Sequence, residues 1–267
     1  MDLELSGKTA IVTGGSRGIG KAIARELGRE GVDVVIASRG REALEATAQE
    51  LASETGRRII PITVDTSNEE SVQTMVQQAA TELGHLDILV NSAARVGGGG
   101  GPPPKLADIT QEDFWEDMNT KVLGYLRCAK EVAPYMQRQG WGRIINISGL
   151  AARQSGSVMG SIRNVAVAAM TKNLADELGP QGINVTVIHP GLTRTERTEG
   201  VVAEQASRQG ITTEEAEKRM AEGVSVRRII DAREIAYVVA FLASPKSIAI
   251  NGDAVAVAGG SGRAIHY

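Results

Sequence analysis

The sequence has one cysteine, few aromatic residues and little net charge. Cys128 is the only cysteine among 267 residues, which excludes an internal disulfide and a thiolate-rich metal site, so we expect no bound metal. Its place within a helical pattern predicts a buried, inert thiol. Aromatic residues make up 3% of the chain, so aliphatic side chains must build the core. The formal net charge of −3 gives no reason to expect binding to nucleic acid or to an anionic membrane.

Membrane and export signals are also missing from the sequence. No apolar stretch approaches the roughly 20 residues that are needed to cross a bilayer. The segment Met1 to Gly7 has neither the basic nor the apolar region of a secretory signal. We therefore expect a soluble, cytoplasmic protein with a small-molecule substrate.

Short β-branched runs alternate with longer helical patterns along the chain, which is typical of βαβ units and a parallel sheet. Most of the runs are apolar throughout, as expected for strands that helices cover on both faces. We expect a single α/β domain over residues 1–267, a doubly wound Rossmann sheet of six or seven strands in the order 3-2-1-4-5-6-7. The predicted strands are Thr9 to Thr13, Val32 to Ser38, Ile59 to Val64, Asp87 to Asn91, Arg143 to Ser148, Ile183 to His189 and Ala254 to Ala258. The predicted helices include Lys21 to Glu30, Arg41 to Glu54, Glu69 to Leu83 and Asp113 to Arg138.

Two segments interrupt this alternation. Residues 95–105 are rich in glycine and proline and can form neither helix nor strand. They follow the fourth strand, so we interpret them either as a surface insertion or as a flap on the substrate side. Residues 193–228 form a polar, partly helical excursion after the sixth strand, and we predict a substrate lid there.

A glycine-rich turn joins the first predicted strand to the first helix. Thr13 to Gly20 has the spacing Gly-x-x-x-Gly-x-Gly, which lets the backbone turn sharply and approach a phosphate. The N-terminus of the following helix offers unpaired N–H groups and partial positive charge to that phosphate. The context of strand, turn and helix favours a dinucleotide site over a purely structural turn.

The end of the second strand indicates which dinucleotide binds. An NAD site usually has an acidic residue there for the ribose 2′-hydroxyl, whereas NADP requires cations for its 2′-phosphate. This sequence has Ser38-Arg39 at that point and Arg17 inside the glycine turn. Guanidinium groups form charge-assisted, bidentate contacts with phosphate, so we expect NADP, with NAD as the less favoured cofactor.

Taken together, these motifs make the chain resemble the short-chain dehydrogenase/reductase family over nearly its whole length. Further matching pieces are Val64-Asp65, Asn91 to Ala94, Asn119, Gly142 to Ser148, Pro190-Gly191, Phe241 to Pro245 and the glycines at 252, 259 and 260. The resemblance implies a role for Asp65 at the adenine, for Asn91 and Ala93 along the riboses, and for Pro190 to Thr195 at the carboxamide. The full set of expected cofactor residues is Gly14, Ser16, Arg17, Gly18, Ile19, Gly20, Ser38, Arg39, Asp65, Thr66, Asn91, Ala93, Pro190, Gly191, Thr193 and Thr195.

The catalytic part of the family pattern is absent. Members of the family use a Tyr-x-x-x-Lys pair, one helical turn apart, to exchange the proton and to hold the ribose. Counting back from Met170 to Ala175 in the same predicted helix, the tyrosine position falls on Gly160 and the lysine position on Asn164. No tyrosine occurs between Tyr135 and Tyr237. The loss of a general acid costs about 10²- to 10⁴-fold in rate, so this protein has either replaced the acid or abandoned hydride chemistry.

Several polar residues are candidates for the missing roles. Ser148 could orient a substrate oxygen, although the family's serine more often occupies the next position, Gly149; alternatively its hydroxyl satisfies backbone. Asn119 matches the asparagine of the family's water relay, with a structural role as the alternative. Arg163 and Asn164 lie on the expected helix, where a guanidinium could stabilise developing negative charge, unless Arg163 is a surface residue. We expect Lys121 to project from a different helix face and to be solvated.

Two histidines and the C-terminus supply the remaining acid–base candidates. His189 ends the predicted sixth strand near the expected nicotinamide, where it is either a proton donor or a packed, hydrogen-bonded residue. His85 is expected to be exposed. The last two residues, His266 and Tyr267, could reach a neighbouring subunit, because the resemblance implies a homo-oligomer, either a dimer or a tetramer.

Three functions are compatible with these observations. The first is an NADP(H)-dependent oxidoreductase that acts on a small carbonyl, alcohol or activated alkene through a non-standard proton-transfer site. The second is a non-catalytic NADP(H) sensor or assembly subunit. The third is a lyase or isomerase that reuses the pocket. The sequence favours the first and leaves the other two open.

Overall fold

A seven-stranded parallel sheet forms the centre of the computed structural model, which describes residues 1–94 and 104–262. The strands lie in the order β3-β2-β1-β4-β5-β6-β9, which confirms the predicted order because β9 is the seventh strand of this sheet along the chain. The order reverses between β1 and β4, which is the point where open α/β sheets bind ligands. The strands are β1 (Thr9–Thr13), β2 (Asp33–Ser38), β3 (Ile59–Thr63), β4 (Ile88–Asn91), β5 (Gly142–Ile147), β6 (Ile183–Pro190) and β9 (Ala254–Val257).

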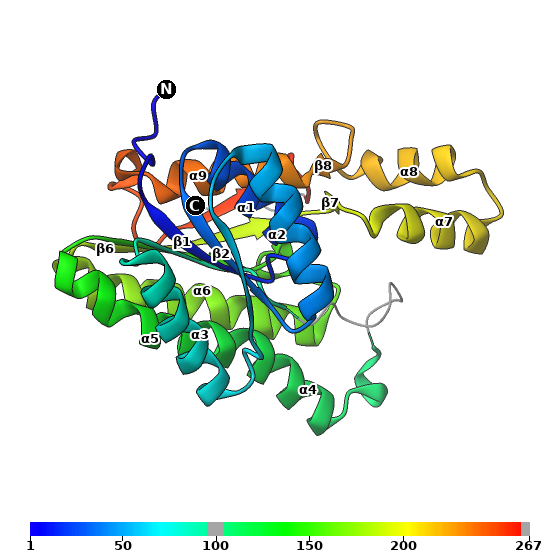
Figure 1. The fold of residues 1–267 in the computed structure, drawn as a ribbon. Coiled ribbons are helices and arrows are strands. Elements are labelled where there is room, and N and C mark those ends of the chain that lie inside the picture. Colours follow the sequence, from blue (N-terminus) through cyan, green and yellow to red (C-terminus); the bar gives the residue numbers. More distant parts are fainter. Residues whose placement is uncertain (95–103, 263–267) are drawn as a thin grey trace.

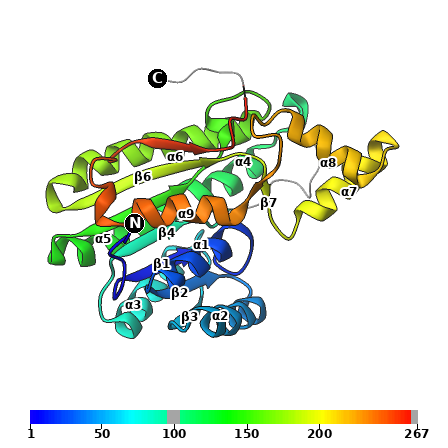
Figure 2. The ribbon, with the colours of Figure 1, turned by 90° about the horizontal axis from the view of Figure 1, so that it is seen from above.

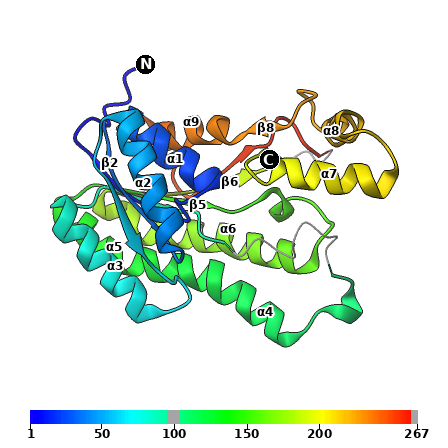
Figure 3. The same cartoon turned by 45° about the vertical axis from the view of Figure 1, so that its right-hand side comes forward.

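Helices cover both faces of the sheet. On one face lie α1 (Gly18–Arg29), α2 (Arg41–Thr55) and α9 (Ala232–Ala243), and on the other lie α3 (Glu69–Leu83), α5 (Gly124–Gln139) and α6 (Val158–Leu178) (Figures 1 and 3). Successive side chains of a strand point to opposite faces, so each layer of helices takes alternate residues. Val12 belongs to the cluster with Ile23 and Val239, whereas its neighbour Ile11 belongs to the cluster with Met75. This is why the strands are apolar throughout.

The helix predicted over Asp113 to Arg138 is interrupted. It divides into α4 (Gln111–Met118), a π-helical turn at Asn119–Leu123, and α5. Thr110 caps α4 by accepting a hydrogen bond from the backbone N–H of Asp113. A π-helical turn changes which side chains face the core, and such turns are frequent at functional sites. The turn contains Lys121, whose ammonium contacts the carbonyl of Ser148, the residue that follows β5.

Residues 193–228 form an outlying helical hairpin. It contains β7 (Thr193–Arg194), α7 (Thr198–Gln209) and α8 (Thr213–Glu222), and it returns to the body through β8 (Ile230–Asp231), which pairs with β7. Figures 1 and 2 show α7 and α8 side by side, projecting beyond the sheet. The two helices pack through a small apolar cluster of Val202, Ala206 and Ala216. The hairpin therefore has a core of its own.

Other features of the sequence bear on this fold. None of the helices in the described ranges 1–94 and 104–262 has the length and apolar character to cross a membrane. Most of the predicted glycine- and proline-rich loop, residues 95–103, lies outside the described residues, and so do His266 and Tyr267. Pro104 and Lys105, the described end of that loop, are exposed and irregular.

Candidate functional site

The glycine turn between β1 and α1 has the geometry of a phosphate cradle. Gly14 and Gly18 adopt positive φ angles of 70° and 58°, which favour glycine. A Cβ on Gly20 would lie 2.3 Å from the carbonyl oxygen of Gly14, so a side chain there would force the turn open. The side chain of the N-cap residue, Arg17, forms no capping hydrogen bond. The N-terminus of this helix therefore faces the turn with donors that suit an anion.

Glu196, from the hairpin segment, already contacts this cradle. Its Oε2 atom accepts a hydrogen bond of 3.0 Å from the backbone N–H of Gly18. A carboxylate at the N-terminus of a helix is favourable for the same reason as a phosphate, so the two would compete for this N–H group. Glu196 was not singled out from the sequence, because its neighbour in space is 178 residues away.

The end of β2 has polar groups that suit a 2′-phosphate. Arg17 and Arg39 are exposed, and neither forms an ion pair with any residue in the described part of the chain. The Oγ atom of Ser38 is buried and has no hydrogen-bond partner among the described residues. Buried polar atoms are nearly always hydrogen-bonded, so an unpartnered one at this place indicates a ligand contact. The three groups fit a phosphate that lies over the end of β2.

Asp65 and Thr66 follow β3 at the same edge of the sheet. The carboxylate of Asp65 accepts hydrogen bonds from the hydroxyl and the backbone N–H of Ser67, at 2.6 and 3.0 Å. These bonds, together with the charge of Arg39, lower the pKa of Asp65 below its usual value, so it stays a charged acceptor. Thr66 is turned inward, and its hydroxyl donates to the carbonyl of Thr120 at 3.2 Å. Asp65 is therefore the better placed of the two to meet a ligand.

The loop after β4 packs directly on the glycine turn. Thr13 Oγ1 accepts hydrogen bonds from the backbone N–H groups of Ser92 and Ala93, at 3.1 and 3.2 Å. A Cβ on Gly14 would lie 2.9 Å from the carbonyl oxygen of Ser92. The amide nitrogen of Asn91 donates to Asn146 Oδ1 at 3.0 Å, while its own Oδ1 is buried without a partner among the described residues. Asn91 therefore offers an acceptor at the predicted ribose position.

The segment after β6 connects the cradle to a pocket. A Cβ on Gly18 would lie 3.6 Å from Thr195 Cγ2, so Thr195 borders the glycine turn. Thr193 donates a hydrogen bond to the carbonyl of Gly191 at 3.0 Å. Pro190 and Gly191 line a pocket of about 500 Å³. The predicted cofactor residues at the carboxyl end of β6 therefore border both the cradle and the pocket.

This pocket lies between the end of β5, the start of α6 and the hairpin. Its lining is Ser148, Gly149, Leu150, Ala151, Gln154, Arg163, Asn164, Pro190, Gly191, Leu192, Met220, Gly223, Val224, Ser261 and Gly262. The hairpin contributes Met220, Gly223 and Val224, so residues 193–228 form one wall. None of these lining residues, all from the described ranges, is a tyrosine, lysine, histidine, cysteine or carboxylic acid.

The predicted candidates Ser148 and Asn164, which line the pocket, contact each other and the buried Lys121. Lys121 Nζ donates to the carbonyl oxygen of Ser148 at 2.8 Å and to Asn164 Oδ1 at 3.1 Å. The hydroxyl of Ser148 donates to the carbonyl oxygen of Asn164 at 3.0 Å. The Ser148 hydroxyl is thus engaged with backbone, which was the alternative to a substrate-orienting role.

The prediction that Lys121 is solvated was wrong, because the residue is 3% exposed. The prediction rested on the offset of two residues from Asn119, which places Lys121 on a different helix face from Asn119. A signal for burial is present in the sequence, since Lys121 lies four residues before Tyr125 and seven before Cys128, on their helix face. Burial, and to a smaller extent the charge of Arg163, lowers the pKa of Lys121 to about 7, while Asp117 acts in the opposite direction.

Asn119 lies apart from this cluster. Its Oδ1 accepts a hydrogen bond of 2.8 Å from Arg127, and its amide nitrogen donates to the carbonyl of Ser67 at 3.5 Å. The structure thus brings Lys121, and not Asn119, next to Asn164. Gly160, which the sequence register predicts at the family's tyrosine position, donates its N–H to the Ser157 side chain at the start of α6.

Arg163 is held at the pocket by a partly buried ion pair. Its guanidinium donates to Asp117 on α4 at 2.5 Å, and the two side chains are 17% and 11% exposed. The Nε atom of Arg163 is buried without a partner among the described residues. Arg163 is therefore no ordinary surface residue.

The remaining candidates lie elsewhere. His85 is partly exposed, as predicted, and contacts Asp87 at 3.0 Å. His189 is 1% exposed at the end of β6, and it is absent from the pocket lining. Cys128 is fully buried, which confirms the predicted buried thiol, and burial raises the pKa of this thiol to about 12.

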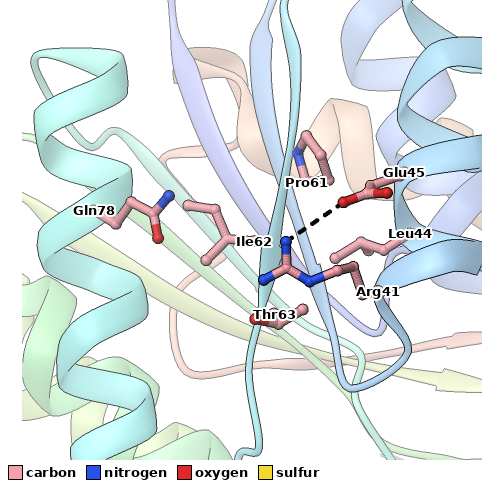
Figure 4. Close-up of a pocket in the computed structure, with 7 residues that line it drawn as sticks. All are labelled: Arg41, Leu44, Glu45, Pro61, Ile62, Thr63 and Gln78. Carbon is pink, nitrogen blue, oxygen red and sulfur yellow. Dashed lines mark ion pairs between the residues drawn. The ribbon is translucent and has the colours of Figure 1, made fainter.

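A second, smaller hollow of about 90 Å³ lies over β3 (Figure 4). Seven residues from α2, β3 and α3 line it, and Arg41 is paired with Glu45 at 3.6 Å. None of the predicted cofactor residues borders this hollow. It is therefore separate from the site at the glycine turn.

Comparison with known proteins agrees with this geometry. A family model described as "Enoyl-(Acyl carrier protein) reductase" matches residues 14–261. The NADPH-dependent reductase BacG of Bacillus subtilis is 31% identical over 98% of this chain and 100% of its own length. A putative ketoacyl reductase of Streptomyces coelicolor is 33% identical over 96% of this chain and 97% of its own length. The structure of L-sorbose reductase from Gluconobacter frateurii, complexed with NADPH and L-sorbose, has a TM-score of 0.91 and 29% identity over 98% of each chain.

These matches extend over the glycine turn, the sheet and the pocket alike. The strand order is the one that the alternation of strands and helices in the sequence predicted. The chain belongs to the short-chain dehydrogenase/reductase family.

Proposed function

We propose that this protein is an NADP(H)-dependent reductase that acts on a small or medium-sized carbonyl compound, alcohol or activated alkene. The observation that carries the proposal is the set of ligand-free polar groups around the glycine turn: the exposed guanidiniums of Arg17 and Arg39 and the unpartnered Oγ of Ser38. Relatives whose names include NADPH-dependent reductase, and a neighbour in complex with NADPH, support the same cofactor.

The residues present fit this cofactor along its whole length. The glycine turn and the N-terminus of α1 would hold the pyrophosphate, with Ser16 and Ile19 beside it. Arg17, Ser38 and Arg39 would hold the 2′-phosphate, and Asp65 would accept from the adenine amine. Asn91 Oδ1 would meet a ribose hydroxyl, and Pro190 to Thr195 would hold the nicotinamide end. When bound, NADPH would supply a hydride.

The pocket favours a substrate with one polar end and an apolar flank. Leu150, Leu192 and Met220 offer apolar surface, while Asn164 and Arg163 offer donors. Residues 193–228 would act as the substrate lid, because they form one wall of the pocket and also contact the cradle through Glu196.

An activated alkene suits this lining best. None of the pocket residues in the described ranges carries a group that readily gives up a proton near neutral pH. Addition of hydride to an alkene conjugated with a carbonyl spreads the charge over an enolate, so the oxygen needs stabilisation more than immediate protonation. We therefore rank conjugated enones above simple ketones as substrates.

We also propose that the protein forms a homo-oligomer, a dimer or a tetramer. Leu123, Leu126, Ile162 and Val165 on the outer side of the π-helical turn, α5 and α6 are 38–50% exposed. Apolar side chains gathered on one side of a molecule are typical of an interface. Analytical ultracentrifugation of the protein and of Leu126→Glu tests this, since a variant that keeps the parent's subunit number would contradict the assignment.

The test of function combines binding and turnover. NADPH and NADH are titrated by fluorescence, and ketone and enone panels are then screened for loss of absorbance at the nicotinamide band. Tighter binding of NADPH together with turnover supports the proposal. Binding without turnover on either panel would point to the sensor or to the lyase and isomerase readings. Absence of NADPH binding would refute all three.

A further inference from the structure

Lys121 is a buried charged group for which the proposed reductase function assigns no role. Its ammonium lies behind the pocket wall, bonded to the Ser148 carbonyl and to Asn164 Oδ1 at 2.8 and 3.1 Å. The residue is 3% exposed, and a lysine is almost never fully buried unless its charged group has a polar partner. Asn164, in turn, lines the pocket. Ser148 and Asn164, the two residues that accept these hydrogen bonds, thus both lie between the lysine and the pocket.

The chemistry of the contact fixes which way the amide faces. A lysine amine or ammonium donates hydrogen bonds through its N–H groups, so the carbonyl oxygen of the Asn164 side chain must face it. The Nδ2 group then faces the opposite way, toward Gly149, which also lines the pocket. A Cβ on Gly149 would lie 2.8 Å from Nδ2. The backbone of Gly149 is extended, with φ of 172°, so its lack of a side chain serves access and not conformation.

We propose that Asn164 Nδ2 is the catalytic hydrogen-bond donor to the substrate oxygen, and that Lys121 is the positioning residue that orients and polarises this amide from behind. The inference rests on the proposed reductase function. Lys121 lies on the π-helical turn, and Asn164 lies on α6. The sequence register predicts that Asn164 occupies the position where the family has its lysine. Gly149 leaves the space through which the oxygen approaches.

The electron flow of such a reduction balances. The hydride brings an electron pair to the substrate carbon, and the pair displaced from the π bond comes to rest on the substrate oxygen. That oxygen, an alkoxide or an enolate, accepts the hydrogen bond from Nδ2. Its proton, or the proton of the enolate carbon, comes from solvent water. A donor aimed at the place where charge develops lowers the barrier without giving up its own proton.

The surroundings of Lys121 are compatible with a charge that acts through Asn164. Arg163 on α6 and Asp117 on α4 are the charged groups that act on it, and they pair with each other. The ring of Tyr125 on α5 lies with its centroid 5.9 Å from Nζ, and its hydroxyl donates to the carbonyl of Ile147 on β5. From β5, the facing group is the Ser148 carbonyl. A protonated Lys121 withdraws electron density through Oδ1 and makes the Nδ2 hydrogens better donors; a neutral one does so less.

The sharpest test replaces the amide by an acid of the same shape. Asn164→Asp keeps the oxygen that accepts from Lys121 and removes the Nδ2 donor. The matched control is Asn173→Asp, the same change on an exposed residue of the same helix. With an enone or ketone that the parent protein reduces, we expect kcat of Asn164→Asp to fall by about 10²-fold or more, as for loss of one oxyanion donor, with NADPH affinity unchanged. The control should retain the parent kcat.

Lys121→Met tests the positioning role. We expect a lower kcat with NADPH affinity retained. We also expect kcat of the parent to decline with rising pH as Lys121 deprotonates, and this decline to be lost in Lys121→Met. A readout that needs no turnover is the NMR signal of the Asn164 side-chain amide, assigned by its absence from Asn164→Asp. This signal should move as Lys121 titrates.

The outcomes separate the two proposals. If the parent binds NADPH and reduces no substrate, the proposed function fails and this inference fails with it. If the parent turns over and Asn164→Asp keeps its kcat, the inference alone is overturned. An Asn164 amide signal that does not move while Lys121 titrates also overturns the positioning role, whatever the turnover.

Discussion

Lys121 should make the stability of this protein depend on pH in an unusual direction. Burial lowers its pKa from 10.5 to about 7 in the folded chain, while the unfolded chain keeps the ordinary value. Between these two values the unfolded state binds one more proton than the folded state. The free energy of unfolding should therefore rise with pH across this interval. Carboxylates titrate mostly near about pH 4, well below this interval, so their effect on stability can be told apart from that of Lys121.

The magnitude follows from the same two pKa values. At about 1.4 kcal/mol per pH unit, the full difference between 10.5 and about 7 corresponds to about 5 kcal/mol. Between pH 7 and pH 9 the expected rise is about 3 kcal/mol. Below pH 7 the whole penalty for burying the charge is present, and above pH 10.5 none of it remains.

Lys121→Met isolates this term. The substitution keeps the length of the side chain and removes its charge, at the cost of leaving two acceptors unpaired, about 1–3 kcal/mol each. That cost does not depend on pH, so the informative quantity is the difference between the parent and variant curves. Urea unfolding, followed by circular dichroism at several pH values and one protein concentration, gives both curves.

The control for Lys121→Met is the same substitution at an exposed lysine. Lys172 is an exposed lysine on α6, and Lys172→Met should give a curve parallel to that of the parent. If the parent and Lys121→Met curves are also parallel from pH 6 to pH 9, Lys121 ionises as a solvated lysine does. The buried cluster with Asn164 would then be refuted.

Three further predictions concern the cofactor site and the core. Glu196→Gln should tighten NADPH binding about two- to fivefold at low salt, because it removes a negative charge from the N-terminus of α1. The control Glu199→Gln should leave the affinity unchanged. Weaker binding in Glu196→Gln would contradict the idea that Glu196 and the phosphate compete for the Gly18 N–H group. Arg39→Glu should weaken NADPH binding about 10-fold or more relative to NADH, as loss of a charge-assisted hydrogen bond predicts, whereas Arg41→Gln, already paired with Glu45, should leave the cofactor preference alone. The Cys128 thiol, whose pKa burial raises to about 12, should react with Ellman's reagent only after unfolding, and fast reaction in the native protein would show that α5 opens.

The sequence by itself determined the sheet and the phosphate cradle. Strands that helices cover on both faces have continuous apolar sequences, so they could be located. The alternation of strands and helices then predicted the strand order of a doubly wound sheet. The glycine turn was predictable because its function depends on the backbone: Gly14 and Gly20 are required by φ and by a 2.3 Å approach that are local to one turn. Ser38 and Arg39 could be assigned to the 2′-phosphate because they lie at the end of the second strand, where a Rossmann fold distinguishes NAD from NADP.

Tertiary structure alone decided the arrangement around the pocket. Lys121 reaches Asn164 across 43 residues of sequence, and Glu196 reaches Gly18 across 178. No local pattern encodes such a meeting, because it depends on a π-helical turn that redirects one side chain and on a hairpin that folds back over the sheet edge. From the sequence we predicted that the family's Tyr-x-x-x-Lys pair is absent from the segment that forms α6. The structure shows that Lys121, on the π-helical turn before α5, contacts Asn164 on α6. This contact follows from the packing of the helices, because packing brings together polar groups that are far apart in the sequence.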